Sequence, residues 1–377
     1  MDFELSEELV SLQDMARELL AERWGGDPVR QGLDRPPVRI PDELWLELAQ
    51  LGWLGVACDE AVGGGGQDLM TAAILSTEAG RGLLPGTLVT TLAAAMALDR
   101  SGDEALRQNV LTEVIAGRRR ISIACEEAHG EWGPEHVAMV AVASADGREL
   151  MLSGTKILVP DGTAANLFLV VARTGTGLAF LPVAVDAAGL TVTPMQRFDG
   201  EDIAELRFDN VRVPASAVLG GAEADALVRS IYDRWVVLLA ANLLGDAEAV
   251  LHQTNEYAKQ RVQFGRAIGS FQAVSHRLAD VVVSVEIGRS LCYAACLYLD
   301  EGHAQAGLFA SAAKAWMSET AVEAAEAALQ LHGGIGYTWE LDVHLHLRRV
   351  RANAVSLGDA AWHRERIARQ VEARYRS

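Results

Sequence analysis

The hydrophobic period of the chain changes twice along its 377 residues, and this limits the folds available to it. Up to about residue 118, alanine- and leucine-rich segments broken by glycine and proline predict helices. From about 119 to 222, short β-rich stretches recur about every ten residues, and Leu206 and Phe208 alternate with charged residues as in a half-buried strand. From about 223 the helical period returns. We therefore predict an α+β protein with a helical domain at 1–118, an antiparallel β-barrel or sandwich at 119–222, and a helix bundle at 223–377.

Two segments of the last zone predict bundle helices. The stretch Trp235–Gly245 is apolar on every side, which is typical of a helix inside a bundle. Between Phe309 and Leu329 the apolar residues keep an i, i+3, i+4, i+7 stripe, and Lys314 falls off this stripe. The second segment therefore predicts an amphipathic helix with Lys314 on its polar side.

The charge of the chain excludes several partners. A formal net charge of −18 disfavours nucleic acids and anionic membrane surfaces. No apolar run approaches the roughly 18 residues of a membrane span, and the acidic N-terminus lacks the layout of a signal peptide. The glycine run at 63–66 has no GK[ST] ending, and the four cysteines have no zinc-like spacing. We expect a cytoplasmic protein without a bound metal.

Two glycine-containing motifs could contact a ligand. In RVQFGRAIGSFQ, Arg261 precedes Phe264-Gly265 and could offer its guanidinium to a phosphate, although a surface arginine beside a packed turn explains it equally well. In QLHGGIGY, Gly333, Gly334 and Gly336 directly follow the predicted amphipathic helix. Helix capping accounts for one of these glycines, and close approach of a ligand to the backbone would account for the others.

Together these motifs resemble those of the acyl-CoA dehydrogenases, a family of FAD flavoproteins. RVQFGRAIGSFQ is similar to the family's Arg-x-x-Phe-Gly…Phe-Gln signature, and QLHGGIGYTWE to its Gln-x-x-Gly-Gly-x-Gly signature. LGWLGVACDEAVGGGG and RFDNVRVPASAVLG resemble further family segments, so the resemblance covers nearly the whole chain. It implies an N-terminal helical domain, a middle β domain and a C-terminal four-helix bundle.

The resemblance also implies a set of FAD contacts. In the family the arginine approaches the pyrophosphate, while the glutamine and glycines meet the adenosine half, across a dimer interface. The candidate contacts here are Arg261, Phe264, Gln272, Gln330, Gly333 and Gly334. They would serve a flavin that lies mainly in the neighbouring subunit.

The carboxylate base of the family is missing from both of its usual positions. The base precedes a glycine near the C-terminus, and Leu357 stands before the matching Gly358. The other family position falls at about Trp235. Asp359 remains as a candidate catalytic base, and the alternative role is that it caps the following helix.

The β domain departs from the family as well. The family's Thr-Glu-Pro and Gly-Ser-Asp segment, which lines flavin and substrate, corresponds here to ACEEAHGEWGP, with Cys125 at the threonine. An aromatic residue usually follows the Gly-Thr-Lys turn, and Ile157 and Leu158 stand there instead. The half of the FAD site that the chain's own β domain would build therefore lacks the family's residues. The half that the chain would offer to a neighbouring subunit keeps them.

Three hypotheses follow from this asymmetry. In the preferred one, the chain is the base-lacking subunit of an α2β2 acyl-CoA dehydrogenase, of the kind associated with steroid side chains, and completes the FAD site of its partner. Alternatively, it is a self-sufficient homomeric enzyme that uses Asp359 or another base. In the third, it is a flavin-free assembly subunit. The first two imply an acyl-CoA substrate and an electron-transfer acceptor.

Overall fold

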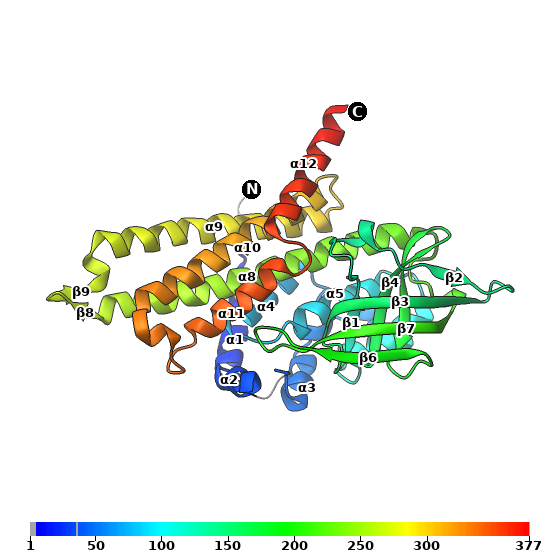
Figure 1. The fold of residues 1–377 in the computed structure, drawn as a ribbon, viewed down its shortest axis with the longest axis horizontal. Coiled ribbons are helices and arrows are strands. Elements are labelled where there is room, and N and C mark those ends of the chain that lie inside the picture. Colours follow the sequence, from blue (N-terminus) through cyan, green and yellow to red (C-terminus); the bar gives the residue numbers. More distant parts are fainter. Residues whose placement is uncertain (1–4, 35–36, 377) are drawn as a thin grey trace. The chain divides into compact units, whose positions relative to one another are not determined.

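The computed structural model of the chain describes residues 5–34 and 37–376. Figure 1 follows the chain from blue to red. It divides into two compact units. The bundle unit comprises Met1–Arg35, Ala73–Leu84 and Val236–Ser377, and the β unit comprises Pro36–Ala72 and Pro85–Trp235. The domain boundaries predicted at 118/119 and 222/223 stay a prediction.

The β unit contains two sheets. Their strands are β1 (Ile121–Ala124), β2 (Ala141–Ala143), β3 (Glu149–Pro160), β4 (Leu167–Thr174), β5 (Gly177–Ala184), β6 (Leu190–Met195) and β7 (Ile203–Pro214). One sheet has the order β2-β3-β7-β6 and is antiparallel throughout, and the other has the order β1-β4-β5. The predicted antiparallel β architecture is confirmed, with one difference: β1 pairs with β4 in parallel, Ile121 lying opposite Leu167.

Both sheets of the β unit contribute to one hydrophobic core. Phe168 of β4, Leu181 of β5, Leu206 and Phe208 of β7 belong to it, as the alternation of residues 205–209 predicts. The unit also contains the helices α3 (Asp42–Gln50), α5 (Thr87–Asp99), α6 (Glu104–Leu106) and α7 (Thr112–Ile115). Strand β1, which the sequence pattern did not reveal, is buried at all four positions because it is covered on both faces.

The bundle unit is helical, as predicted. Its helices are α1 (Glu7–Arg23), α2 (Asp27–Asp34), α4 (Leu69–Arg81, most of which lies here), the C-terminal part of α8 (Ala224–Gln260), α9 (Gln272–Asp300), α10 (Ala306–His332), α11 (Val343–Val355) and α12 (Ala360–Arg376). Helices α4 and α8 meet through their backbones: a Cβ on Gly245 would lie 1.8 Å from the Thr77 carbonyl oxygen. Only glycine permits this contact.

Two helices are long and apolar enough to cross a membrane by length and composition alone: Gly221–Gln260 and Gln272–Asp300. The core helix of a protein that does not enter a membrane passes the same test. In the first helix 89% of the apolar window is buried, as predicted for Trp235–Gly245. In the second, α9, only 44% is buried.

Candidate functional site

The first motif forms the connection between α8 and α9. Strands β8 (Val262–Gln263) and β9 (Arg266–Ala267) pair as a short hairpin at one end of the bundle unit (Figure 1). Phe264 stands at its turn with a φ of 53°, and 92% of its surface is exposed. Its ring meets Phe271 edge-on at 6.1 Å, and the guanidinium of Arg266 lies 3.9 Å above Phe271. An exposed aromatic residue in the left-handed region is costly, which is typical of a residue that contacts something outside the chain.

The polar side chains of this motif are available for a ligand. Arg261 directly follows α8, and its backbone N–H donates to the Tyr257 carbonyl at 2.8 Å. The Arg261 side chain is exposed, and within the described residues no carboxylate forms an ion pair with it. Gln272, the first residue of α9, is also exposed. An arginine without an internal partner can bind an anion with both arms of its guanidinium.

The second motif ends α10. His332 is the last helical residue, and Gly333 follows with φ 64° and ψ −141°, a conformation that only glycine adopts readily. No atom lies within 4 Å of the position that a Cβ would take on Gly333 or Gly334. Gln330, one turn earlier, is exposed. The glycines therefore present bare backbone to the outside of the chain and do not serve a contact within it.

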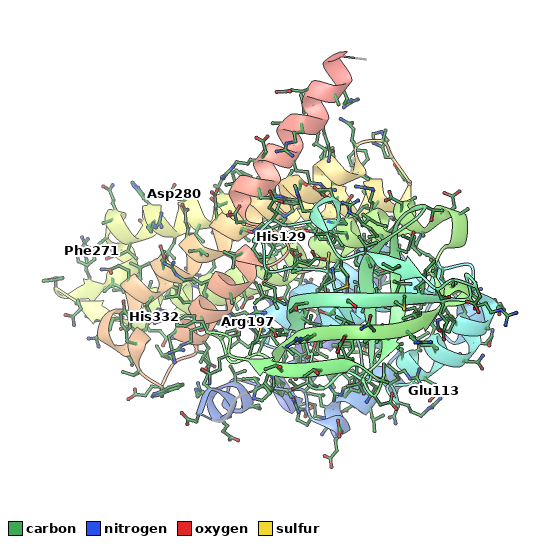
Figure 2. The ribbon with its side chains drawn as sticks, turned by 45° about the vertical axis from the view of Figure 1, so that its right-hand side comes forward. Glu113, His129, Arg197, Phe271, Asp280 and His332 are labelled. Carbon is green, nitrogen blue, oxygen red and sulfur yellow. The ribbon has the colours of Figure 1, made fainter. Side chains whose placement is uncertain are left out.

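An aromatic stack holds the two motifs together. The rings of Tyr257, near the end of α8, and His332 lie 4.4 Å apart at 26°. His332 is buried, and its Nδ1 bonds to the Ala328 carbonyl at 2.8 Å. Figure 2 shows Phe271 and His332 at the same end of the bundle unit. We call the six exposed residues at this end the motif surface: Arg261, Phe264, Gln272, Gln330, Gly333 and Gly334.

The loop between α11 and α12 contains the other sequence candidates. Leu357 is buried, with 5% of its surface exposed, and cannot accept a proton. Oδ1 of Asp359 accepts a hydrogen bond of 2.8 Å from the backbone N–H of Trp362. Asp359 therefore caps α12, which is the alternative role that the sequence left open for it. Its role as a base stays a prediction.

Two basic side chains hold this loop from inside the bundle unit. Lys314 is fully buried, and its Nζ donates to Ser318 Oγ (2.9 Å) and to the carbonyl oxygens of Ala354 and Gly358 (both 3.0 Å). Burial lowers the pKa of Lys314 to about 7, against the opposing charge of Asp359. The prediction that Lys314 lies on the polar side of its helix is wrong. The loop between α11 and α12 supplies backbone acceptors for the buried ammonium group, and the hydrophobic pattern of one helix cannot reveal them.

His363 completes the support of the loop. It is fully buried, and its Nε2 donates to the Leu357 carbonyl at 3.0 Å. Burial lowers its pKa to about 2, and the charges of Lys314 and Arg366 act in the same direction. The imidazole is therefore neutral, with its proton on Nε2.

The structure does not bring the loop and the motif surface of one chain together. Lys314, which holds the loop, and Gln330 are 16 residues apart on α10, which corresponds to about 24 Å along the helix. Asp359 is thus far from the motif residues of its own chain. The two groups of candidates lie at different places in the bundle unit.

The β unit contains a buried ionic group that the sequence analysis missed. Nζ of Lys156 has no exposed surface and donates to Glu127 Oε1 (2.6 Å) and to the Cys125 carbonyl (2.9 Å). The backbone N–H groups of Ala138 and Met139 also donate to the Glu127 carboxylate. Burial opposes the ionisation of Glu127, but the charge of Lys156 and these hydrogen bonds together hold its pKa below the usual value.

The carboxyl of the neighbouring residue, Glu126, has a raised pKa instead of a lowered one. Oε1 of Glu126 is buried and finds no hydrogen-bond donor among the described residues. Burial raises the pKa of Glu126 to about 7; Lys156 opposes this shift, and the charges of Glu127 and Glu135 add to it. Two adjacent carboxyls whose pKa values diverge are typical of a functional site. The paired glutamates directly after Cys125 were the available sequence signal.

Replacing Glu126 by glutamine is expected to remove a pH dependence of stability. The folded-state pKa of Glu126, about 7, lies above its unfolded value of 4.5, so its contribution is fully present below pH 4.5 and is lost as the pH rises through 7. The stability of the wild type relative to Glu126→Gln should fall by about 3 kcal/mol between these pH values. Urea unfolding at pH 4.5, 5.5, 6.5 and 7.5 measures this.

Glu43→Gln, which removes an exposed carboxyl of the same unit, is the matched control. Its stability should run parallel to that of the wild type across the same pH range. A Glu126→Gln curve that is also parallel to the wild type would contradict the raised pKa.

Comparison with known proteins identifies the family. The model of the acyl-CoA dehydrogenase C-terminal domain matches residues 234–372, and that of the N-terminal domain matches residues 6–118. The acyl-CoA dehydrogenase IpdE2 of Mycobacterium tuberculosis is 32% identical over 92% of this chain and 92% of its own length. The probable acyl-CoA dehydrogenase YngJ of Bacillus subtilis is 29% identical over 98% of this chain and 100% of its own. The chain belongs to the acyl-CoA dehydrogenase family.

Several solved structures share the whole fold. The Tcur3481-Tcur3483 steroid ACAD variant superposes with a TM-score of 0.90 at 32% identity, covering 98% of this chain and 99% of its own. The ChsE4-ChsE5 complex from Mycobacterium tuberculosis gives a TM-score of 0.89 at 28% identity, covering 99% of both chains. PigA with FAD and proline gives 0.90 at 25% identity, covering 99% and 100%. The cofactor of the acyl-CoA dehydrogenase family is FAD.

The bundle unit of this acyl-CoA dehydrogenase fits one half of FAD. The unpaired guanidinium of Arg261 suits the pyrophosphate, and the open backbone at Gly333 and Gly334 leaves space for the adenosine. The residues of the β unit fit the flavin ring less well. Cys125 is buried, and burial raises the pKa of its thiol, while Glu126 places an unpaired carboxyl beside it.

Proposed function

We propose that this chain is the base-lacking subunit of a heteromeric acyl-CoA dehydrogenase. Its motif surface completes the FAD site of a partner subunit that carries the catalytic glutamate. FAD held there would supply the hydride acceptor for the oxidation of an acyl-CoA thioester between its α and β carbons. The role of this chain is to bind and orient that cofactor.

The observation that carries the proposal is the exposed state of the motif surface. All six residues are exposed, and neither Arg261 nor Gly333 and Gly334 make a contact within residues 5–34 and 37–376 that would explain them. Lys314, which holds the loop between α11 and α12, and Gln330 of the motif surface are separated by about 24 Å along α10, and this separation supports a role of the motif surface toward another subunit. An anion-binding arginine and open glycines with no internal purpose fit a cofactor that is held by a neighbour.

The missing base supports the same conclusion. Leu357 and Trp235 occupy the two positions where the resemblance places the glutamate, and both are buried apolar residues. Oδ1 of Asp359 caps α12. A chain that lacks the base needs a partner that supplies it.

Two structural relatives support a heteromer. The ChsE4-ChsE5 structure is a complex, and Tcur3481-Tcur3483 is a steroid ACAD. By analogy, the substrate of the proposed assembly is a CoA thioester of a steroid side chain, and the assembly is α2β2. An electron-transfer protein would reoxidise the flavin.

Expressing the chain alone and together with a complete acyl-CoA dehydrogenase subunit tests this proposal. The subunit to choose is one that carries the glutamate and is encoded beside this chain. Alone, the chain should be colourless near 450 nm; co-purified, it should form a stable complex with bound flavin and reduce an electron acceptor in the presence of acyl-CoA. Flavin absorbance and acyl-CoA oxidation by the chain alone would instead favour the self-sufficient homomer. A stable complex that lacks flavin would favour the assembly subunit.

A further inference from the structure

A small polar cavity lies within the bundle unit, apart from the motif surface. Its volume is about 220 Å³, and residues of α1, α4, α8 and α11 line it together with Gly25 and Gly26. By proportion with an apolar cavity of about 150 Å³ that binds benzene, it holds a ligand of about nine non-hydrogen atoms. Its charged and polar lining residues are Arg17, Glu78, Arg81, Gln253, Asp342 and His346.

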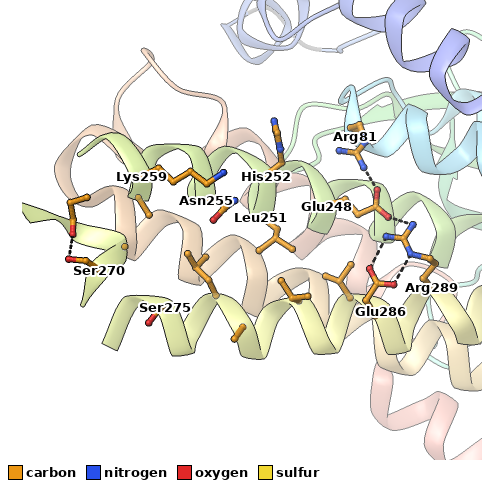
Figure 3. A pocket seen from close by; sticks show the side chains of 17 residues that line it. Arg81, Glu248, Leu251, His252, Asn255, Lys259, Ser270, Ser275, Glu286 and Arg289 are labelled. Atoms are coloured by element: carbon orange, nitrogen blue, oxygen red, sulfur yellow. Dashed lines mark hydrogen bonds and ion pairs between the residues drawn. The ribbon is translucent and has the colours of Figure 1, made fainter. Parts of the chain in front are cut away.

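The wall formed by α1 and α4 has more positive than negative charge. Arg17 donates to both carboxylate oxygens of Glu78, at 3.1 and 2.9 Å, and Arg81 lies 3.2 Å from the same carboxylate. The Glu78 side chain has no exposed surface. Arg81 also pairs with Glu248, which Arg289 neutralises in turn (Figure 3). Two guanidiniums are therefore balanced by one carboxylate in this wall, which favours a ligand with a carboxylate of its own.

The wall at the start of α11 presents hydrogen-bond acceptors instead. Asp342, which directly precedes α11, accepts from Arg30 through Oδ1, and its Oδ2 makes no hydrogen bond within the described residues. Nδ1 of His346 lies 2.7 Å from Oδ1 of Asp246, and both side chains are buried. This bond places the proton on Nδ1, so Nε2 of the neutral ring is an acceptor. Two acceptors in one wall suit a ligand with an ammonium group.

Two glycines make room for the carboxylate of this wall. A Cβ on Gly26 would lie 2.5 Å from both carboxylate oxygens of Asp342, so a larger residue at position 26 would displace them. Gly25 has a φ of 62°, which other residues adopt only at a cost in free energy. The chain therefore brings Asp342 against bare backbone at the edge of the cavity.

The polar groups of the cavity are not all used by contacts within the chain. The half-buried amide of Gln253 makes no hydrogen bond in the described part of the chain, and neither does Nε2 of His346. Polar groups that line a cavity bond to protein, water or a ligand, because an unsatisfied group costs free energy. A molecule with both a donor and an acceptor end satisfies the two walls together.

We propose that this cavity binds a small zwitterion of the size of an amino acid, with its carboxylate toward Arg17 and Arg81 and its ammonium group toward Asp342 and His346. The charges of Arg17 and Arg81 cancel those of Glu78 and Asp342 among the lining residues, so a ligand without net charge enters at the lowest cost. The site is separate from the proposed flavin contacts and does not depend on them.

Thermal unfolding of the full chain with each uncharged amino acid in turn identifies the tightest ligand. At least one should raise the Tm, because a molecule that binds only the folded state stabilises it. Calorimetric titration then compares this amino acid with its deamino acid and its decarboxylated amine, each of which lacks one of the two charges. Both should bind at least about tenfold more weakly. The absence of any thermal shift, or equal binding of the deamino acid, would overturn the proposal.

Asp342→Asn tests the position of the ammonium group and should weaken binding of that amino acid by at least about tenfold. Asp27→Asn is the matched control, because Asp27 pairs with the same Arg30 but is 80% exposed and lies outside the cavity lining. It should bind the amino acid like the wild type. Gln253→Leu should also weaken binding without removing an ion pair, and far-UV circular dichroism checks that each variant is folded. Unchanged affinity in Asp342→Asn and Gln253→Leu would place the amino acid elsewhere and overturn the inference.

Discussion

Replacing Arg261 by alanine should lower the affinity of the assembled complex for FAD by about 10- to 100-fold, the range for a lost hydrogen bond to a charged group. The side chain is exposed and unpaired in the described part of the chain, so its removal leaves no buried partner and costs little stability. Titration of the deflavinated complex with FAD, followed by flavin fluorescence, measures the affinity. The chain itself should unfold at the same urea concentration as the wild type.

Arg369→Ala is the control, because Arg369 is also an exposed arginine, with 69% of its side chain accessible, and it lies on α12, where it pairs with Glu365. It should bind FAD like the wild type. Arg261→Lys should recover only part of the affinity, since an ammonium cannot form the paired hydrogen bonds of a guanidinium. Unchanged FAD binding in Arg261→Ala would remove this residue from the proposed flavin site.

Replacing Glu248 by alanine should destabilise the bundle unit by about 3 kcal/mol. Glu248 on α8 is 7% exposed and forms ion pairs with Arg81 of α4 and Arg289 of α9 (Figure 3). Burial raises its pKa, and the two arginines oppose that shift. The expected loss lies at the lower end for a broken buried pair, because Arg81 keeps Glu78 (3.2 Å) and Arg289 keeps Glu286.

The variant Glu286→Ala tests whether the burial of Glu248, and not its charge alone, makes its ion pairs important for stability. Glu286 pairs with the same Arg289 but is 58% exposed, so its removal should cost less than about 1 kcal/mol. Urea unfolding of both variants at one pH measures the difference. Equal losses in the two variants would contradict the view that burial of Glu248 makes its ion pairs important.

Much of the fold could be predicted because it depends on how apolar residues are spaced along one segment. The predicted alternation of Leu206 and Phe208 with charged residues lies within β7 (Ile203–Pro214), since alternation of apolar and polar residues is a property of the strand itself. The all-round apolar stretch Trp235–Gly245 is buried in α8 for the same reason. Strand β1 was missed because a short strand covered on both faces has no alternation.

The candidate site could be predicted only in part. The two motifs were recognisable from their residues, and the structure exposes all six predicted residues at the same end of the bundle unit. The burial of Lys314 could not be predicted, because its acceptors, the carbonyl groups of Ala354 and Gly358, follow it by 40 and 44 residues. The divergent states of Glu126 and Glu127 depend in the same way on Lys156, a residue of another strand.

The sequence alone determined the α+β class, the strands of the larger sheet, the family resemblance and the absence of a glutamate before Gly358. These are properties of residue type and spacing along one segment. The tertiary structure decided which polar side chains are buried with partners, which carboxyl is left without one, and that α9 keeps an apolar face uncovered. Such features arise from contacts between distant segments, because the free energy of a buried charge or an exposed apolar stripe is set by its neighbours in space.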